Sequence, residues 1–426
     1  MNRFLTGLLL AVACSLYIFP VAFSFIPESI NSKMILAVIG VLFFVRDCIM
    51  DRSFAMRRSI VISALFSVIF SVWCYYSEVA NNTSDGSYTT YFISFATWLG
   101  GAYAIISMLR LAYGKVDLQL LTRYFTIVCV AQCTAALVME NNVNIRLMVD
   151  RFIVQGQEFY QEVNRMYGIG AALDSGGIRF SACLLLIAHL LSTERDEEEG
   201  QAATYLYLAA FLFITVVGNM ISRTTSVGMT LGLVYFAIRN FTIRHGNLTR
   251  KQARTFGALL VILLAAAGIS VWLYNSNMSF RSDFRFAFEG FFNWVETGEF
   301  STDSTDKLNR VMWIWPETAK GWTIGTGIFG NFVYSTDIGY CRFTLYCGLI
   351  GLGIFSLFFI FNGVSVRDKF NGGALLVTAL IALTFIIWFK VATDLFFMNA
   401  LLFCLDPDNV DGTPETEEGA PAEITG

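Results

Sequence analysis

Long apolar stretches recur along almost the whole chain, and they are the feature that most constrains its fold. Many of them approach the roughly 20 residues that an α-helix needs to cross a bilayer. Charged residues make up only 15% of the sequence, whereas soluble domains carry about 25%. The pattern predicts an all-α polytopic membrane protein in which residues 1–405 form a single transmembrane domain.

Counting the stretches predicts about twelve transmembrane helices. The first begins at Phe4 and is expected to be retained rather than cleaved as a signal peptide, because so many spans follow it. The last, Asp394–Leu405, is short, so it is either a crossing or a re-entrant turn. The spans predicted between them are 34–50, 59–76, 89–109, 120–139, 177–192, 203–221, 226–239, 256–274, 338–361 and 373–389. Residues 406–426 are rich in Glu and are predicted to be a disordered acidic tail.

The distribution of Lys and Arg among the loops indicates the orientation of the chain. Positive residues mark the cytoplasmic loops of membrane proteins, and they gather in every second loop if the N-terminus is cytoplasmic. The residues of these inner loops are Arg46, Arg52, Arg57, Arg58, Arg110, Lys115, Arg123, Arg195, Arg239, Arg244, Arg250, Lys251, Arg254, Arg367 and Lys369. Two long loops, 140–176 and 275–337, are then extracytoplasmic.

Both long loops contain segments with helical periodicity. In the second loop the apolar residues at spacings of three and four are Phe280, Phe284, Phe288, Phe291 and Val295. Such an amphipathic helix either lies in the membrane interface or packs on neighbouring spans. Under both interpretations, helices cover the outer face of the membrane domain.

Cysteine and histidine usage argues against a metal site. The nine Cys form no CxxC pair and fall largely inside apolar stretches, where thiols behave as small hydrophobic groups. We therefore expect no metal and no other cofactor, and nothing in the sequence predicts binding to nucleic acid.

Arg223 lies in a tight turn between two apolar stretches, at the outer edge of the membrane. An arginine there is costly unless it meets a partner or lines a wet cavity. Its side chain either extends to the outer headgroups, or its fork-shaped guanidinium holds a phosphate.

The second long loop contains further candidate site residues. Arg310 precedes Trp313, Trp315 and Trp322, whose rings either anchor the loop in the membrane interface or stack against sugars. The glycines in this stretch let the backbone turn tightly and approach a ligand; they are Gly321, Gly325, Gly327 and Gly330.

Several charged residues stand where the loops re-enter the membrane. Asp337, near Arg342, suits a general base that takes a hydroxyl proton, although it could instead cap a helix or pair with Arg342. Asp174 has a similar position at the end of the first loop. Lys390 and Asp394, one helical turn apart, are expected to pair with each other.

At these residues the sequence resembles the O-antigen polymerase (Wzy-type) family, within the wider superfamily of O-antigen ligases and polymerases. The resemblance covers most of the chain as architecture. Locally it rests on Ser222–Thr224, on Asn309–Gly327 and on Asp337–Gly351. Polymerases of this family have been described with an Arg, ten residues and a Gly in each long loop. Two pairs fit that spacing, Arg165 with Gly176 and Arg310 with Gly321.

The resemblance implies a GT-C-like glycosyltransferase in the bacterial inner (plasma) membrane. It would polymerise undecaprenyl-diphosphate-linked oligosaccharide repeat units into a surface polysaccharide at the outer face. Arg223 and Arg310 would hold the donor diphosphate as it leaves, and Asp337 would be the catalytic base, with Asp174 the second choice. The residues expected to bind substrate are Arg165, Arg179, Arg342, Tyr340, Trp322 and Asp174. The expected partners are the lipid-linked glycans, the bilayer, a chain-length regulator and a flippase.

Two other functions are compatible with a chain of this kind. An O-antigen ligase carries a His near the position of Asp337, whereas His189 and His245 both lie toward the inner face. A flippase or other transporter should place ionisable groups near the middle of the membrane. The predicted spans are nearly free of charge, which favours the polymerase.

Overall fold

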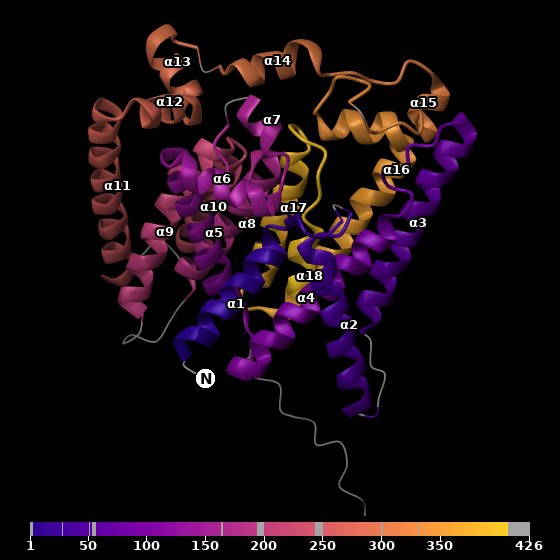
Figure 1. Cartoon of the computed structure of the whole chain (residues 1–426), viewed down its shortest axis with the longest axis horizontal. Helices are drawn as coiled ribbons and strands as arrows, with labels where there is room; N and C mark the ends of the chain where they lie inside the picture. The colour runs from indigo at the N-terminus through magenta and orange to yellow at the C-terminus, as the bar shows by residue number, and fades with distance from the viewer. Residues whose placement is uncertain are drawn as a thin grey trace, which may run out of the picture.

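The computed structural model describes residues 3–27, 29–50, 52, 57–162, 165–193, 200–242, 250–299, 301–330 and 332–407. These residues are mostly helical, as predicted, and the longer helices stand together in a bundle (Figure 1). The helices of the bundle are α1 (Arg3–Ile18), α2 (Ser32–Met50), α3 (Arg58–Asn81), α4 (Tyr91–Tyr113), α5 (Leu118–Asn141), α8 (Leu173–Ser192), α9 (Gly200–Ile221), α10 (Thr225–Ala237), α11 (Arg250–Ser276), α16 (Gly339–Val364), α17 (Gly373–Ile387) and α18 (Phe396–Cys404), with the short turns η1 (Ile238–Thr242) and η2 (Arg367–Lys369).

Among the described residues, six helices are long and apolar enough to cross a membrane. They are α3, α4, α5, α8, α9 and α16. The apolar helices α1 and α17 are shorter, at 16 and 15 residues. Helix α18 has nine residues, which span about 14 Å at 1.5 Å per residue, so it cannot cross the roughly 30 Å core of a bilayer alone. The chain is therefore an all-α membrane protein.

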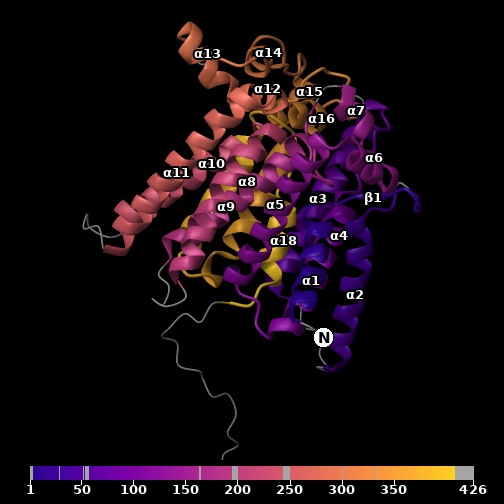
Figure 2. The ribbon, with the colours of Figure 1, turned by 60° about the vertical axis from the view of Figure 1, so that its left-hand side comes forward.

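The helices of the two long loops lie at one end of the bundle, which we call the loop end. In Figures 1 and 2 they lie at the top, away from the N-terminus. The first loop forms α6 (Val143–Phe152) and α7 (Gln157–Glu162), and a two-residue strand, β2 (Ile153–Val154), that pairs with β1 (Ala22–Phe23). The second loop forms α12 (Met278–Ala287), α13 (Glu289–Thr297), α14 (Asp303–Val311) and α15 (Ala319–Ile324).

The periodic phenylalanines of the second loop form two helices, because the chain turns at Phe288. The pattern was expected to mark a helix that packs on neighbouring spans or one that lies in the membrane interface, and the two helices differ in this respect. Phe280 in α12 packs against the main core, whereas Phe291 and Val295 in α13 are 53% and 64% exposed. Thus α12 docks on the bundle, and α13 presents apolar side chains to its surroundings.

Helix α16 is broken near its beginning, and the second loop fills the break. Gly348 has a φ of 68° and a ψ of −178°, which interrupts the hydrogen bonds of the helix. The carbonyls freed there accept hydrogen bonds from Thr326 N (to Leu345, 2.7 Å) and Gly327 N (to Tyr346, 2.9 Å). A Cβ on Gly325 would overlap the Tyr346 carbonyl. Gly325 therefore serves a close approach to the protein's own backbone.

A second irregular segment, residues 388–395, connects α17 to α18 and is only partly buried. Such backbone is tolerated at membrane depth only where protein buries it or it lines a cavity. Trp388 donates from Nε1 to the Thr393 carbonyl (2.6 Å), and its own carbonyl accepts from Tyr340 N (3.2 Å). The short segment that follows is buried from Phe396 to Phe403. Its far end is held by Arg110, whose guanidinium lies 2.8 Å from Asp406, the first residue of the predicted tail. Residues 408–426 of that tail lie outside the described residues.

Candidate functional site

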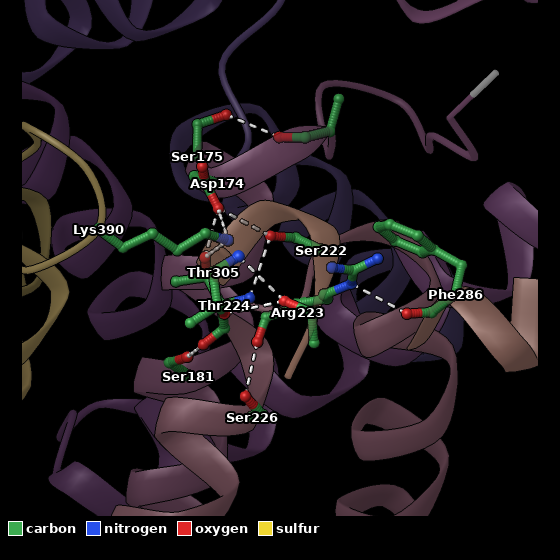
Figure 3. Close-up of polar contacts among 12 residues, drawn as sticks. Asp174, Ser175, Ser181, Ser222, Arg223, Thr224, Ser226, Phe286, Thr305 and Lys390 are labelled. Carbon is green, nitrogen blue, oxygen red and sulfur yellow. Dashed lines mark hydrogen bonds and ion pairs between the residues drawn. The ribbon is translucent and has the colours of Figure 1, made fainter. Parts of the chain in front are cut away.

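The site is built around Asp174, in the first turn of α8 at the loop end. Its Oδ1 accepts hydrogen bonds from Ser222 Oγ (3.2 Å) and from the Thr224 hydroxyl. Lys390 Nζ lies 2.7 Å from the same oxygen and 2.9 Å from Thr224 Oγ1, as Figure 3 shows. One carboxylate therefore joins α8, the α9–α10 turn and the segment between α17 and α18.

Close packing between α8 and α10 holds this network in place. Gly228 lies directly against the backbone of Ser181, where a side chain would clash. Ser181 Oγ accepts from Gly228 N (3.2 Å) and donates to the Thr224 carbonyl (2.9 Å). The turn that carries Ser222 and Thr224 is thereby fixed above the start of α8.

The predicted pairing of Lys390 with Asp394 is wrong. An i, i+4 pair requires a continuous helix, and residues 388–395 are not helical. Asp394 instead accepts hydrogen bonds from Tyr91 Oη (3.4 Å) and Phe396 N (3.2 Å). Lys390 is turned to the other side of the segment and reaches Asp174.

Arg223 connects the bundle to the second loop. Its Nε donates to the Phe286 carbonyl (2.9 Å), and its guanidinium forms an ion pair with Glu289. The guanidinium carbon lies 3.9 Å from the centre of the Phe286 ring. The side chain is only 16% exposed, because Phe286 and Glu289 cover most of it.

Arg165 of the first loop meets the same aromatic ring. Its guanidinium carbon is 3.7 Å from the centre of the Phe286 ring. Among the described residues, this guanidinium has no hydrogen-bond partner. Burial, and then the neighbouring charge of Arg223, lower the pKa of Arg165. Two like charges on one ring repel each other, and a bound anion would relieve that repulsion.

Asp337 stands just before α16, and both simpler interpretations of it fail. Ile338 is the N-cap of α16, and no side chain caps the helix. Within the described part of the chain, the Asp337 carboxylate makes no hydrogen bond and no ion pair. Burial raises its pKa, as does the charge of Asp174, while Arg342, Lys307 and Lys390 act in the opposite direction. A half-buried carboxylate with a raised pKa and no fixed partner is suited to accept a proton.

Arg342, whose charge acts on this carboxylate, is held by the segment between α15 and α16. Its guanidinium donates to the Phe329 carbonyl (2.8 Å) and lies 3.9 Å from the centre of the Phe329 ring. Asp85 fixes that segment, because its Oδ2 accepts from Phe329 N (3.1 Å) and Gly330 N (2.7 Å). A hollow of about 10 Å³ borders Arg342, which is room for about one water molecule.

The remaining predicted site residues lie apart from this cluster. Arg310 is exposed on α14 and contacts neither Arg223 nor Arg165. Arg179 is directed into the bundle, where it donates to the carbonyls of Ile18 and Ser175. Tyr340 donates its hydroxyl to the Phe385 carbonyl (2.9 Å). Trp322 is stacked on Trp315, with ring centres 5.5 Å apart.

Four residues of the site were not predicted as site residues from the sequence: Phe286, Glu289, Asp85 and Lys390, which was expected only to pair with Asp394. Phe286 and Glu289 lie in the amphipathic stretch, but helical spacing does not indicate which bundle residue they meet. Asp85 lies in a short loop, and its partners are more than 240 residues away along the chain. No local pattern carries that information.

No protein-family model, curated protein or solved structure matches this chain. The site is therefore interpreted from its own geometry.

Proposed function

We propose that this chain polymerises lipid-linked oligosaccharide repeat units into a surface polysaccharide, with undecaprenyl diphosphate as the leaving group. The proposal places it in the bacterial inner membrane as a GT-C-like glycosyltransferase with about twelve crossings and a cytoplasmic N-terminus. The loop end would face outward. The proposal rests on the sequence resemblance and on the residues that meet at the loop end.

The observation that carries the proposal is the meeting of Arg165 and Arg223 on the Phe286 ring. A diphosphate at the membrane surface needs cationic groups that tolerate a water-poor setting, and guanidinium groups suit planar contacts with phosphate. The two arginines come from different segments, so an anion between them would also draw the first loop toward the turn between α9 and α10. Arg223 would stabilise the charge that develops on the departing diphosphate.

Asp337 supplies the second chemical requirement. A sugar hydroxyl of the acceptor attacks the anomeric carbon of the donor, and the bond from that carbon to the diphosphate oxygen breaks. The hydroxyl proton passes to the Asp337 carboxylate, and the electron pair leaves with the diphosphate. Arg342 and Lys390 keep Asp337 ionised before the reaction. Asp174 is less suited to this role, because Lys390 already neutralises it.

Reconstitution in vesicles with a synthetic undecaprenyl-diphosphate-linked repeat unit tests the proposal. We expect a ladder of products that differ by one repeat unit, and we expect Asp337→Asn and Arg223→Ala to abolish it. The matched control is Arg281→Ala, which removes an exposed arginine of α12 that lies over Tyr274. A single transfer to a lipid acceptor would indicate a ligase, and absence of any new glycosidic bond would refute the proposal.

A second candidate, a transporter of lipid-linked glycans, is favoured by one observation. Arg179 and Asp394 lie inside the bundle and interact electrostatically with each other and with Lys33. Ionisable groups inside a membrane domain often mark a transport pathway. In the same vesicles, movement of the lipid-linked unit to the other leaflet without bond formation would support this function.

A further inference from the structure

Aromatic rings from two distant segments form a continuous exposed surface beside the candidate site. It consists of Trp313 and Trp315, from the segment between α14 and α15, and Phe389, from the segment between α17 and α18. We call it the aromatic ledge. The centres of the Trp313 and Trp315 rings are 5.9 Å apart, and those of Trp313 and Phe389 are 6.4 Å apart.

The ledge is both supported and accessible. Trp322 stacks under Trp315 at an interplanar angle of 17°, and Tyr340 lies 5.0 Å from Phe389, measured between ring centres. These supporting rings restrict the orientations that the Trp315 and Phe389 rings can adopt. Phe389 is 54% exposed, Trp313 40% and Trp315 38%.

The position of the ledge connects it to the reacting groups. Phe389 immediately precedes Lys390, which is bound to Asp174. Tyr340 is three residues from Asp337 and packs with Met312, Ile338 and Cys341. The Thr336 hydroxyl donates to the Met312 carbonyl (2.5 Å), which ties the Trp313 segment to the backbone beside Asp337. The ledge thus shares backbone segments with Asp337, which is proposed as the base, and with Lys390, which is bound to Asp174.

The side-chain chemistry of the ledge fits a saccharide. Aromatic faces pack against the apolar C–H faces of pyranose rings, and the indole N–H groups can donate to hydroxyls. Two other tryptophans satisfy that donor internally: Trp73 donates to the Cys347 carbonyl (2.8 Å), and Trp388 donates to the Thr393 carbonyl (2.6 Å). Within the described residues, the indole N–H groups of Trp313 and Trp315 have no hydrogen-bond partner.

We propose that the aromatic ledge binds the acceptor glycan, laying several sugars across Trp315, Trp313 and Phe389 with the reactive hydroxyl at Asp337. This inference rests on the proposed function and specifies its acceptor side. Because stacking needs only a pyranose face, the ledge holds a chain of sugars with little regard to their identity. It therefore favours acceptors longer than one repeat unit.

Binding of delipidated sugars tests the ledge without requiring catalysis. The probes are end-labelled oligosaccharides released by mild acid from the surface polysaccharide of cells that carry this chain, with cellohexaose as a defined pyranose chain. The protein in nanodiscs is titrated with each probe, and fluorescence anisotropy gives the Kd. The variants are Trp313→Ala, Trp315→Ala and Phe389→Ala. The matched controls are Trp294→Ala on α13 and Trp272→Ala on α11, which remove tryptophans that are 54% and 67% exposed.

We expect each ledge variant to raise the Kd at least about fivefold, since one stacked ring contributes roughly 1 kcal/mol, and the two controls to leave it unchanged. Trp315→Phe should retain most of the binding because it keeps an aromatic face. Wild-type protein that binds neither probe, or ledge variants that bind as wild type does, would overturn the inference. If the controls weaken binding equally, the tryptophans act as membrane anchors and the inference is also overturned. Binding at the ledge without any transfer in vesicles would support the inference and refute the polymerase function.

Discussion

The ammonium nitrogen of Lys390 lies 2.7 Å from a carboxylate oxygen of Asp174, although 216 residues separate them along the chain. Both side chains are close to one-third exposed, at 35% and 29%. The pair fastens the segment between α17 and α18 to the first turn of α8. It also decides which of two nearby carboxylates is neutralised, because Asp337 has no such partner among the described residues.

Removing Lys390 should destabilise the chain through the charge that it leaves behind. Lys390→Met leaves the partly buried carboxylate of Asp174 without its ion-pair partner. We expect the free energy of unfolding to fall by about 1–2 kcal/mol, which is less than for a fully buried pair because both side chains are partly exposed to solvent. The double variant Asp174→Asn with Lys390→Met should lose less than the sum of the two single variants. Thermal unfolding in nanodiscs measures all three. Strict additivity would mean that the pair is not coupled.

Arg165 should matter more for elongation than Arg310. Arg165 shares the Phe286 ring with Arg223, whereas Arg310 is exposed on α14. We expect Arg165→Ala to lower kcat/KM for the donor at least about 100-fold, corresponding to roughly 3 kcal/mol, and Arg310→Ala to lower it less than tenfold. Vesicle assays with the synthetic repeat unit measure both. The opposite order would return the diphosphate role to Arg310.

The pH dependence of transfer should report the raised pKa of Asp337. Only the ionised carboxylate accepts a proton, so activity should rise with pH through that pKa, and the acidic limb should lie above the value of about 4 of an ordinary Asp. Lys307 lowers this pKa, so Lys307→Ala should move the limb to higher pH. Asp174 raises it, so Asp174→Asn should move the limb to lower pH. Profiles of kcat/KM that coincide in all three proteins would exclude Asp337 as the base.

Asp85 should act as a positioning residue for Arg342. Asp85→Ala leaves the amides of Phe329 and Gly330 without their acceptor, which frees the carbonyl that holds Arg342. We expect kcat/KM to fall about tenfold and the acidic limb to move to higher pH, because Arg342 lowers the pKa of Asp337. The control is Asp368→Ala, whose side chain is 84% exposed in η2. A lower rate with an unchanged pH profile would indicate a purely structural role.

Docking of α12 should weaken as the pH rises through the pKa of Asp283. Burial and the charge of Glu140 raise that pKa to about 6, compared with about 4 in an unfolded chain. The native state therefore holds this proton more tightly, so the contribution of Asp283 to stability is greatest below about pH 4 and is lost between about pH 4 and pH 6. The protection factors of the α12 amides, which are hydrogen-exchange rates corrected for the intrinsic acceleration of exchange with pH, should be lower at pH 7 than at pH 5, and Asp283→Asn should remove that difference. If the difference persists in the variant, another titrating group causes the pH dependence.

The lipid environment and the helical secondary structure of this protein could be predicted from its sequence. Apolar stretches too long and too poor in charge for a soluble domain require a lipid environment, and their residues form helices because a bilayer leaves no other way to satisfy the backbone of an open chain. The amphipathic phenylalanines of α12 and α13 were likewise predictable, because helical spacing is a local property. Arg223 and Asp337 stood out because charge at the edge of apolar segments is costly.

Which charged side chains pair with each other depends on the tertiary structure. The expected pairing of Lys390 with Asp394 assumed a continuous helix, and the break at residues 388–395 gave each residue a different partner. The expected partnership of Arg223 with Arg310 gave way to Arg165, because α12 brings Phe286 over the turn between α9 and α10. Ion pairs across a bundle depend on how helices far apart in sequence are packed, and a linear pattern of residues does not record that packing.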